Sequence, residues 1–245
     1  METGRSSQKL YAKNLSCISI LATASSVAKY LISSYKEKRV LMLAKAEHIL
    51  HENYGDKIFW KIRKSMQFAS KLLDLSHNFI KQNLYSQEMD YDTLKVKNIK
   101  MIGRDYMGVH WRRMDFITGK DPSKVISIEK ATSQIIDIMT QLNIRTLFLA
   151  TDTVEKEIED ITKIMNNHNK RILIFRNNMT PGELAIVDQI ICSLSRYFIG
   201  TKDSTFTFRI QEEREIMGFE SNTTYNVFCD GITDCHDISK WKYIE

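Results

Sequence analysis

A polar loop between an apolar run and a helical pattern gives the first indication of chemistry. Residues 201–205, Thr-Lys-Asp-Ser-Thr, follow the β-type run 196–200, and the pattern is helical again from Phe206. The first turn of a helix has free N–H groups and a positive dipole end, and both favour a phosphate. Ser204 or Thr205 could contact such an anion. Taken alone, the same residues also fit an ordinary helix cap.

Polar side chains follow other predicted strands in the same way. The runs typical of strands and of the intervening helices are 107–111, 126–142, 146–150, 154–166, 171–175 and 184–194. Strands that alternate with helices predict a parallel sheet, and ligands lie beyond the carboxyl ends of such strands. At those ends the chain carries His110, Arg112, Arg113, Thr151, Asp152, Arg176 and the 201–205 loop. This convergence indicates binding of a nucleotide or nucleotide sugar.

The remaining segments are mostly helical in pattern. Helices are expected over 23–34, 40–52 and 58–84, the last as one continuous helix with a buried apolar stripe. Residues 17–22 could form a strand, and 86–97 a surface loop. On the helix that begins near Phe206, we expect a largely solvated face that carries Arg209, Glu212, Glu213, Arg214 and Glu215.

Composition narrows the class of ligand. The 245 residues are 43% hydrophobic and 27% charged, which is ordinary for a globular chain, and two prolines with nine glycines argue against a sandwich of many short turns. A formal net charge of +5 suits a small anion but is too weak and dispersed to indicate nucleic acid. No run is long and apolar enough to predict a membrane span.

Metal sites are poorly supported by the sequence. Asp90-Tyr-Asp92 has the Asp-x-Asp form of a metal motif but stands in a charged loop rather than at a strand end. Cys229, Cys235 and His236 lack a second ligand pair at zinc spacing, whereas the two cysteines could close a small ring. Asn-x-Ser/Thr triplets at Asn14, Asn178 and Asn222 favour a secretory compartment.

Four collinear segments resemble the GDP-fucose protein O-fucosyltransferases, in particular those that modify thrombospondin type 1 repeats. The segments are GVHWRRMDF at 108–116, LFLATD at 147–152, AIVDQIICSLSRYFIGTKDSTFTFRIQEEREIMG at 185–218 and TTYNVFC at 223–229. The resemblance implies an α/β fold of B-type glycosyltransferase architecture, with two Rossmann-like domains facing across a cleft. This chain would supply the C-terminal, donor-binding half, a Rossmann-like parallel sheet with helices on both faces. Its domains would be a mostly helical joining region over 1–100 and a GDP-fucose-binding domain over 101–245.

The resemblance also implies roles for single residues. His110, Trp111 and Arg112 fall on the family's His-Leu-Arg donor motif, with tryptophan in place of leucine, and Asp188 falls on its donor-contacting aspartate. The phosphate segment of the family corresponds to Ser204, Thr205 and Phe206. Arg112 would stabilise the leaving phosphate without a metal ion or other cofactor. A Cys229–Cys235 disulfide is implied as well.

The activity implied is inverting transfer of fucose from GDP-fucose to Ser or Thr of a folded thrombospondin type 1 repeat, in the lumen of the endoplasmic reticulum. The family's glutamate base lies in an N-terminal loop that this sequence lacks, so the chain looks N-terminally truncated. Two alternatives are a non-catalytic GDP-sugar-binding fragment and another nucleotide-dependent Rossmann enzyme. The absence of a Gly-x-Gly-x-x-Gly or Walker loop counts against the latter.

Overall fold

The computed structural model describes residues 22–39, 41, 55–84, 103–119 and 125–229. The chain divides into two compact units, Met1–Asp56 and Lys57–Glu245. In the first unit the predicted helix near 23–34 is confirmed as α1, Ala24–Tyr35, whose N-terminus is capped by the Thr23 hydroxyl. The strand expected over 17–22 and the helix over 40–52 lie almost entirely outside the described residues.

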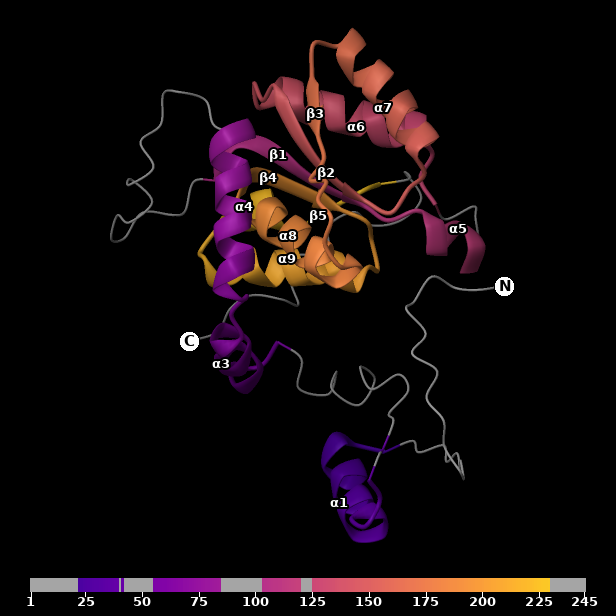
Figure 1. Cartoon of the computed structure of the whole chain (residues 1–245), viewed down its shortest axis with the longest axis vertical. Coiled ribbons are helices and arrows are strands. Elements are labelled where there is room, and N and C mark those ends of the chain that lie inside the picture. Colours follow the sequence, from indigo (N-terminus) through magenta and orange to yellow (C-terminus); the bar gives the residue numbers. More distant parts are fainter. Residues whose placement is uncertain (1–21, 40, 42–54, 85–102, 120–124, 230–245) are drawn as a thin grey trace. The chain divides into compact units, whose positions relative to one another are not determined.

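A parallel five-stranded sheet forms the centre of the second unit, in the order β3-β2-β1-β4-β5. The strands are β1 Arg104–Trp111, β2 Thr146–Thr151, β3 Arg171–Leu173, β4 Ser195–Gly200 and β5 Asn226–Val227. The chain builds outward from β1 to β3 and then crosses back to place β4 on the other side of β1 (Figure 1). The reversal leaves a topological switch point between β1 and β4, where such sheets bind ligands.

Helices cover both faces of this sheet, as predicted. One face packs against α6, Ile128–Gln141, and α7, Glu155–Asn167, and the other against α4, Ser70–Asn83, and α8, Pro181–Ser193 (Figure 1). Side chains of β1 alternate between the two cores: Tyr106 belongs to the α8 side, and Met107 and Val109 to the α6 side. The Rossmann-like fold predicted from the sequence is therefore confirmed.

The helix α9, Thr205–Ile216, begins directly against the end of β4. A Cβ atom on Gly200 would lie 2.4 Å from Cγ2 of Thr207, so a side chain there would force the helix away from the strand. The short helix α10, Ser221–Thr224, then leads to β5, and α5, Met114–Gly119, follows β1. Gly200 thus fixes where the first turn of α9 lies relative to the carboxyl end of the sheet.

The continuous helix expected over 58–84 is wrong. Two helices occupy this range, α3, Lys57–Ser65, and α4, with residues 66–69 between them. The buried Arg63 guanidinium lies 2.7 Å from the Glu212 carboxylate and 2.9 Å from Glu213, and it also donates to the Met66 carbonyl at 3.3 Å. The face of α3 that packs inward is the one that carries Arg63. Ile58 and Ile62, which were predicted to belong to the core stripe, are exposed instead.

The solvated face expected on α9 is wrong for two of its five residues, Glu212 and Arg214, which are buried, whereas Arg209, Glu213 and Glu215 are partly exposed. Arg214 is fully buried, and only 2% of the Glu212 surface is exposed. Glu212 is paired with Arg63, which is distant in the sequence, and with Arg209 on the same helix, whereas Arg214 donates to a set of backbone carbonyls. The compact unit that begins at Lys57 includes α3 and α4. A joining role for residues 1–100 and a separate domain over 101–245 stay predictions.

Candidate functional site

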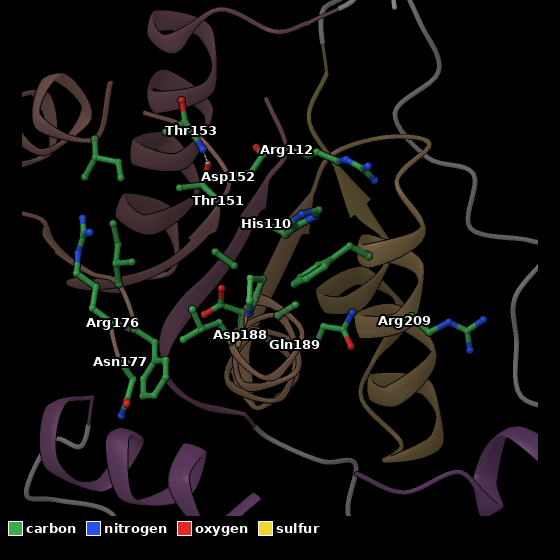
Figure 2. A pocket seen from close by; sticks show the side chains of 18 of the residues that line it. His110, Arg112, Thr151, Asp152, Thr153, Arg176, Asn177, Asp188, Gln189 and Arg209 are labelled. Atoms are coloured by element: carbon green, nitrogen blue, oxygen red, sulfur yellow. Dashed lines mark hydrogen bonds between the residues drawn. The ribbon is translucent and has the colours of Figure 1, made fainter. Parts of the chain in front are cut away.

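An open cavity of about 840 Å³ lies at the carboxyl ends of β1, β2 and β3, between α8 and α9. Its lining comes from the ends of the strands and from two helices: His110 in β1 and Arg112 after it, Thr151 in β2 with Asp152 and Thr153 after it, Arg176 and Asn177 after β3, Asp188 and Gln189 on α8, and Thr205, Phe206 and Arg209 on α9 (Figure 2). Most of the polar groups predicted to converge at the strand ends line this cavity, but Arg113 and residues 201–204 do not. The cavity occupies the place that the topology of the sheet assigns to a ligand.

His110 is held in one orientation by two residues of α9. Its ring stacks on Phe206, with centroids 4.2 Å apart and an interplanar angle of 22°. Its Nδ1 lies 2.8 Å from the Thr207 hydroxyl, and the side chain is 5% exposed. The stacked rings of His110 and Phe206 therefore form a flat wall on one side of the cavity.

The two consecutive arginines after β1 have different surroundings. Arg112 lines the cavity, and its guanidinium carbon lies 5.2 Å from the centre of the Phe116 ring. Arg113 instead binds both carboxylate oxygens of Glu157, at 3.1 and 2.7 Å, and lies over the Trp111 ring at 4.7 Å. Its hydrogen bonds hold the pKa of Glu157 below the usual range. Arg112 is thus the arginine of this pair that can meet a ligand.

A buried carboxylate oxygen without a hydrogen-bond partner among the described residues lies on the α8 side of the cavity. Oδ1 of Asp188 is buried and accepts no hydrogen bond within the described part of the chain. Burial raises the pKa of Asp188 from its ordinary value to about 7. Because buried polar groups are nearly always satisfied, an orphaned carboxylate oxygen at a cavity points to a hydrogen-bond donor on a ligand.

A second orphaned group stands at the start of α9. Ser204 is the N-cap residue, but its side chain makes no capping bond, and its fully buried hydroxyl has no partner among the described residues. Thr205, the next residue, lines the cavity. Asp203 has a positive φ of 59°, a conformation that aspartate tolerates better than most residues. The turn at Asp203 sets the direction in which α9 begins. The N-terminus of α9 is therefore arranged for an anion.

The structure brings together most of the residues proposed from the sequence. His110, Arg112, Asp188, Thr205 and Phe206 all line the one cavity. Ser204 lies immediately before it. The exception is Trp111, whose side chain is buried on the opposite face of β1, in the core with α6 and α7. Any contact of Trp111 with a ligand would have to come from its backbone.

Sequence reasoning missed several residues at the cavity, Thr153 and Asn177 among them. Arg209 and Gln189 line the cavity, and Thr207 holds His110. The four-residue spacing from Thr205 places Arg209 on the same side of α9 and could have indicated it. The pairing of His110 with Thr207 joins residues 97 positions apart and left no signal in the sequence.

The remaining expectations concern cysteines, metals and membranes. Cys229 is disulfide-bonded and Cys192 is free and buried, whereas Cys235 lies outside the described residues, so the Cys229–Cys235 pairing stays a prediction. Asp90 and Asp92 also lie outside them. Where the structure describes the chain, three or more potential metal-binding side chains nowhere come together, and no helix is long and apolar enough to cross a membrane.

Comparisons with known proteins agree on one family. The family model of GDP-fucose protein O-fucosyltransferases matches residues 3–217. Human GDP-fucose protein O-fucosyltransferase 2 is 38% identical over 244 residues, which cover 94% of this chain and 56% of that protein. The Caenorhabditis elegans protein of the same name is 33% identical over 250 residues, or 97% of this chain and 58% of its own length.

Solved structures support the fold. POFUT1 in complex with GDP superimposes with a TM-score of 0.53 at 16% identity, over 83% of this chain and 60% of POFUT1. POFUT1 in complex with GDP-fucose gives the same TM-score at 15% identity, over 85% and 59%. The chain spans somewhat more than half the length of the relatives it matches. On the evidence of its sequence, it belongs to the GDP-fucose protein O-fucosyltransferase family.

Proposed function

We propose that this chain is the donor-binding half of an inverting protein O-fucosyltransferase and holds GDP-fucose in the cavity at the switch point. The observation that carries the proposal is the buried, unpaired Oδ1 atom of Asp188 in a cavity that also presents Arg112 and the N-terminus of α9. The family membership of the chain and the POFUT1 complexes with GDP and GDP-fucose supply the identity of the ligand.

The phosphates would lie between α9 and Arg112. The first N–H groups of α9 and the Ser204 hydroxyl offer donors, and the Arg112 guanidinium offers a planar, permanently charged fork. As the bond between fucose C1 and the phosphate oxygen breaks, negative charge grows on the β-phosphate of GDP. Donors that are already in place stabilise that charge most in the transition state. Neither a metal ion nor another cofactor is needed in this arrangement.

The nucleoside would lie deeper, between α8 and the His110–Phe206 wall. The Asp188 carboxylate accepts hydrogen bonds from N–H groups of the base or from ribose hydroxyls. Stacked rings such as those of His110 and Phe206 suit a flat ligand. Asp188 would lose its proton when the ligand binds. Both oxygens of the ionised carboxylate can accept hydrogen bonds, whereas the protonated acid uses one of them as a donor.

The proton of the acceptor hydroxyl needs a base that the described residues do not offer. Of the acids that line the cavity, Asp152 accepts from the backbone N–H groups of Arg113 and Met114, Glu155 pairs with Arg176, and Asp188 serves the nucleoside. We therefore place the base in the part of the relatives that this chain does not span. Transfer then forms the bond from the Ser or Thr oxygen to C1 while GDP leaves from the opposite side.

The acceptor would be a folded thrombospondin type 1 repeat protein, and the compartment the lumen of the endoplasmic reticulum. The 38% identity to human GDP-fucose protein O-fucosyltransferase 2 supports the first, and the disulfide at Cys229 the second. Asn178 and Asn222 are exposed and could carry N-glycans. Protease protection in native microsomes, with a glycosidase shift and a Cys229–Cys235 peptide in a non-reducing map, is the expected result. Free thiols at Cys229 and Cys235 and an unprotected chain would contradict the luminal location.

Two assays test the function. In titration calorimetry the 245-residue chain should bind GDP weakly, and with radiolabelled GDP-fucose it should transfer no fucose to a thrombospondin type 1 repeat. Fusion to the N-terminal portion of a longer relative should restore transfer. GDP binding without transfer in the fusion would favour a non-catalytic binding fragment. No GDP binding by either protein would refute the proposed site, and robust transfer by the chain alone would show that it contains its own base.

A further inference from the structure

The backbone at Arg112 lies between the ends of two neighbouring strands, and side chains from both hold it. The strand pairing of β1 ends with His110 opposite Gly200 on β4 and with Trp111 opposite Thr151 on β2. Beyond those pairs, backbone ladder bonds no longer fix the chain. Beyond this point, hydrogen bonds from side chains hold the backbone instead.

The peptide bond between Trp111 and Arg112 is fixed at both of its polar atoms. Its N–H donates to the Thr201 hydroxyl at 2.8 Å, and its carbonyl accepts from the Thr151 hydroxyl at 2.6 Å. Thr201 comes from the end of β4 and Thr151 from the end of β2, so the two hydroxyls approach from opposite sides of β1. The Thr201 hydroxyl also donates to the His110 carbonyl at 3.1 Å.

The next peptide bond is held as well. The Arg113 N–H donates to Oδ1 of Asp152 at 2.7 Å, and the Met114 N–H reaches the same oxygen at 3.3 Å. Both peptide planes that flank the Arg112 Cα atom are thus tied to side chains. The φ and ψ angles of Arg112, which set the direction of its Cα–Cβ bond and thus where its side chain starts, follow from the orientation of these planes.

Arg113 adds an anchor on the far side. Its guanidinium binds Glu157 and donates to the Ile126 carbonyl at 2.9 Å, away from the cavity. The Thr153 hydroxyl donates to the same Glu157 carboxylate. The loop therefore cannot turn Arg113 into the cavity in place of Arg112 without breaking a bidentate ion pair. Figure 2 shows Thr151 and Asp152 beside the backbone of Arg112.

We infer that Thr201 and Thr151, assisted by Asp152, are positioning residues that preset the Arg112 side chain for an anionic ligand. This inference rests on the proposed function, in which Arg112 binds the diphosphate. A preset guanidinium loses less conformational freedom when it binds, and such preorganisation raises affinity without a new contact to the ligand.

Thr201→Val tests the inference, because valine has the shape of threonine without the hydroxyl. The variant should weaken GDP binding about threefold to tenfold in titration calorimetry, the range expected for one net hydrogen bond. Thr201→Ser should restore most of the affinity, since it restores the hydroxyl. The matched control is Thr132→Val on α6, which removes a buried hydroxyl bonded to the Ile128 carbonyl and does not line the cavity. It should leave GDP affinity unchanged.

A mutant cycle separates positioning from a general structural effect. If Thr201 acts through Arg112, Thr201→Val should change GDP affinity by less than about twofold in an Arg112→Ala background. An equal loss in both backgrounds would contradict the inference while leaving the proposed function intact. A Thr201→Val protein that binds GDP as tightly as the unaltered chain would contradict it too.

Hydrogen exchange gives a readout that does not depend on GDP. The Arg112 amide should exchange faster in Thr201→Val than in the unaltered chain, whereas amides in the middle of α6 should not change. If the unaltered chain binds no GDP, the proposed function fails, and the exchange result alone decides whether Thr201 fixes this backbone. Unchanged exchange at Arg112 would show that it does not.

Discussion

Two buried polar regions at opposite ends of α9 differ in how completely their groups are paired. At the C-terminal end, Arg214 is fully buried and donates to the carbonyls of Ser193, Ser195 and Thr223 at 2.6 to 3.0 Å. Its guanidinium also lies 4.0 Å from the centre of the Phe219 ring. At the N-terminal end, the buried Ser204 hydroxyl has no partner among the described residues, nor has the buried Asp188 oxygen across the cavity.

The difference separates structural from ligand-binding polar groups. A buried charge whose donors are matched stabilises the fold, since each carbonyl it serves would otherwise be costly to bury. A buried group left unmatched beside a cavity destabilises the empty protein and is retained for what it binds. On this view Arg214 builds the scaffold, and Asp188 and Ser204 belong to the site. The predictions below test that division, from the largest expected effect to the smallest.

Arg214→Met should cause the largest loss of stability. Methionine keeps much of the volume but leaves three backbone carbonyls without donors in a region that water does not reach. We expect a loss of about 4 kcal/mol in the free energy of unfolding, measured by chemical denaturation. Arg176→Met is the control, because Arg176 is 60% exposed and its partner Glu155 is 62% exposed, and it should cost less than about 1 kcal/mol. Similar losses in the two variants would mean that Arg214 has no special structural role.

Arg112→Ala should affect the reaction far more than the fold. In a fusion that carries the missing portion of a relative, we expect transfer to slow by about 10²–10³, the usual effect of removing one donor to developing charge. The free energy of unfolding should change little, because Arg112 is only half-buried at the cavity. Arg112→Lys should recover part of the rate, since a point charge lacks the fork. Near-normal turnover in the alanine variant would remove Arg112 from the site.

Asp188→Asn should change how stability depends on pH. Burial raises the pKa of Asp188 from 3.8 to about 7 in the folded protein, so between those values the folded state holds a proton that the unfolded state has lost. The contribution of Asp188 therefore makes the empty protein less stable as pH rises from about 4 to about 7. Asp188→Asn removes that contribution, and its stability should fall less over this range. Denaturation series at several pH values measure the difference, and parallel curves would refute it.

Ser204→Ala should have the smallest effect, and only on binding. The hydroxyl makes no bond within the described residues, so its removal should leave the free energy of unfolding unchanged or slightly higher. Affinity for GDP should fall about threefold to tenfold if the hydroxyl donates to a phosphate. The control is Ser76→Ala on α4, which removes a buried hydroxyl that donates to the Leu72 carbonyl, and it should not alter GDP affinity. A Ser204→Ala protein that loses stability would place Ser204 with the structural groups.

The sequence predicted most of the sheet and the position of the site, because both depend on local patterns. Alternating apolar runs placed β1 and β2, and the rule for parallel sheets placed His110, Arg112 and the 201–205 loop at one edge. The errors concern polar residues whose partners are distant in the sequence. Arg214 was expected to be solvated because the carbonyls to which it donates belong to Ser193, Ser195 and Thr223, and local patterns do not reveal them. The end of α3 was missed for a similar reason, because Arg63 pairs with Glu212, far along the chain.

Calorimetry of GDP binding across pH, for the unaltered chain and for Asp188→Asn, tests the central claim most directly. If the Asp188 carboxylate accepts hydrogen bonds from the nucleotide, the affinity of the unaltered chain for GDP should rise from about pH 6 to about pH 8. Binding near pH 7 should release part of a proton, seen as a dependence of the enthalpy on the buffer. Asp188→Asn should bind GDP more weakly, and it should keep only the smaller pH dependence and proton release that come from the terminal phosphate of GDP, whose second pKa is about 6. Equal affinity and equal proton release in the two proteins would contradict the account, because Asp188 would then be unpaired for a reason unrelated to the ligand.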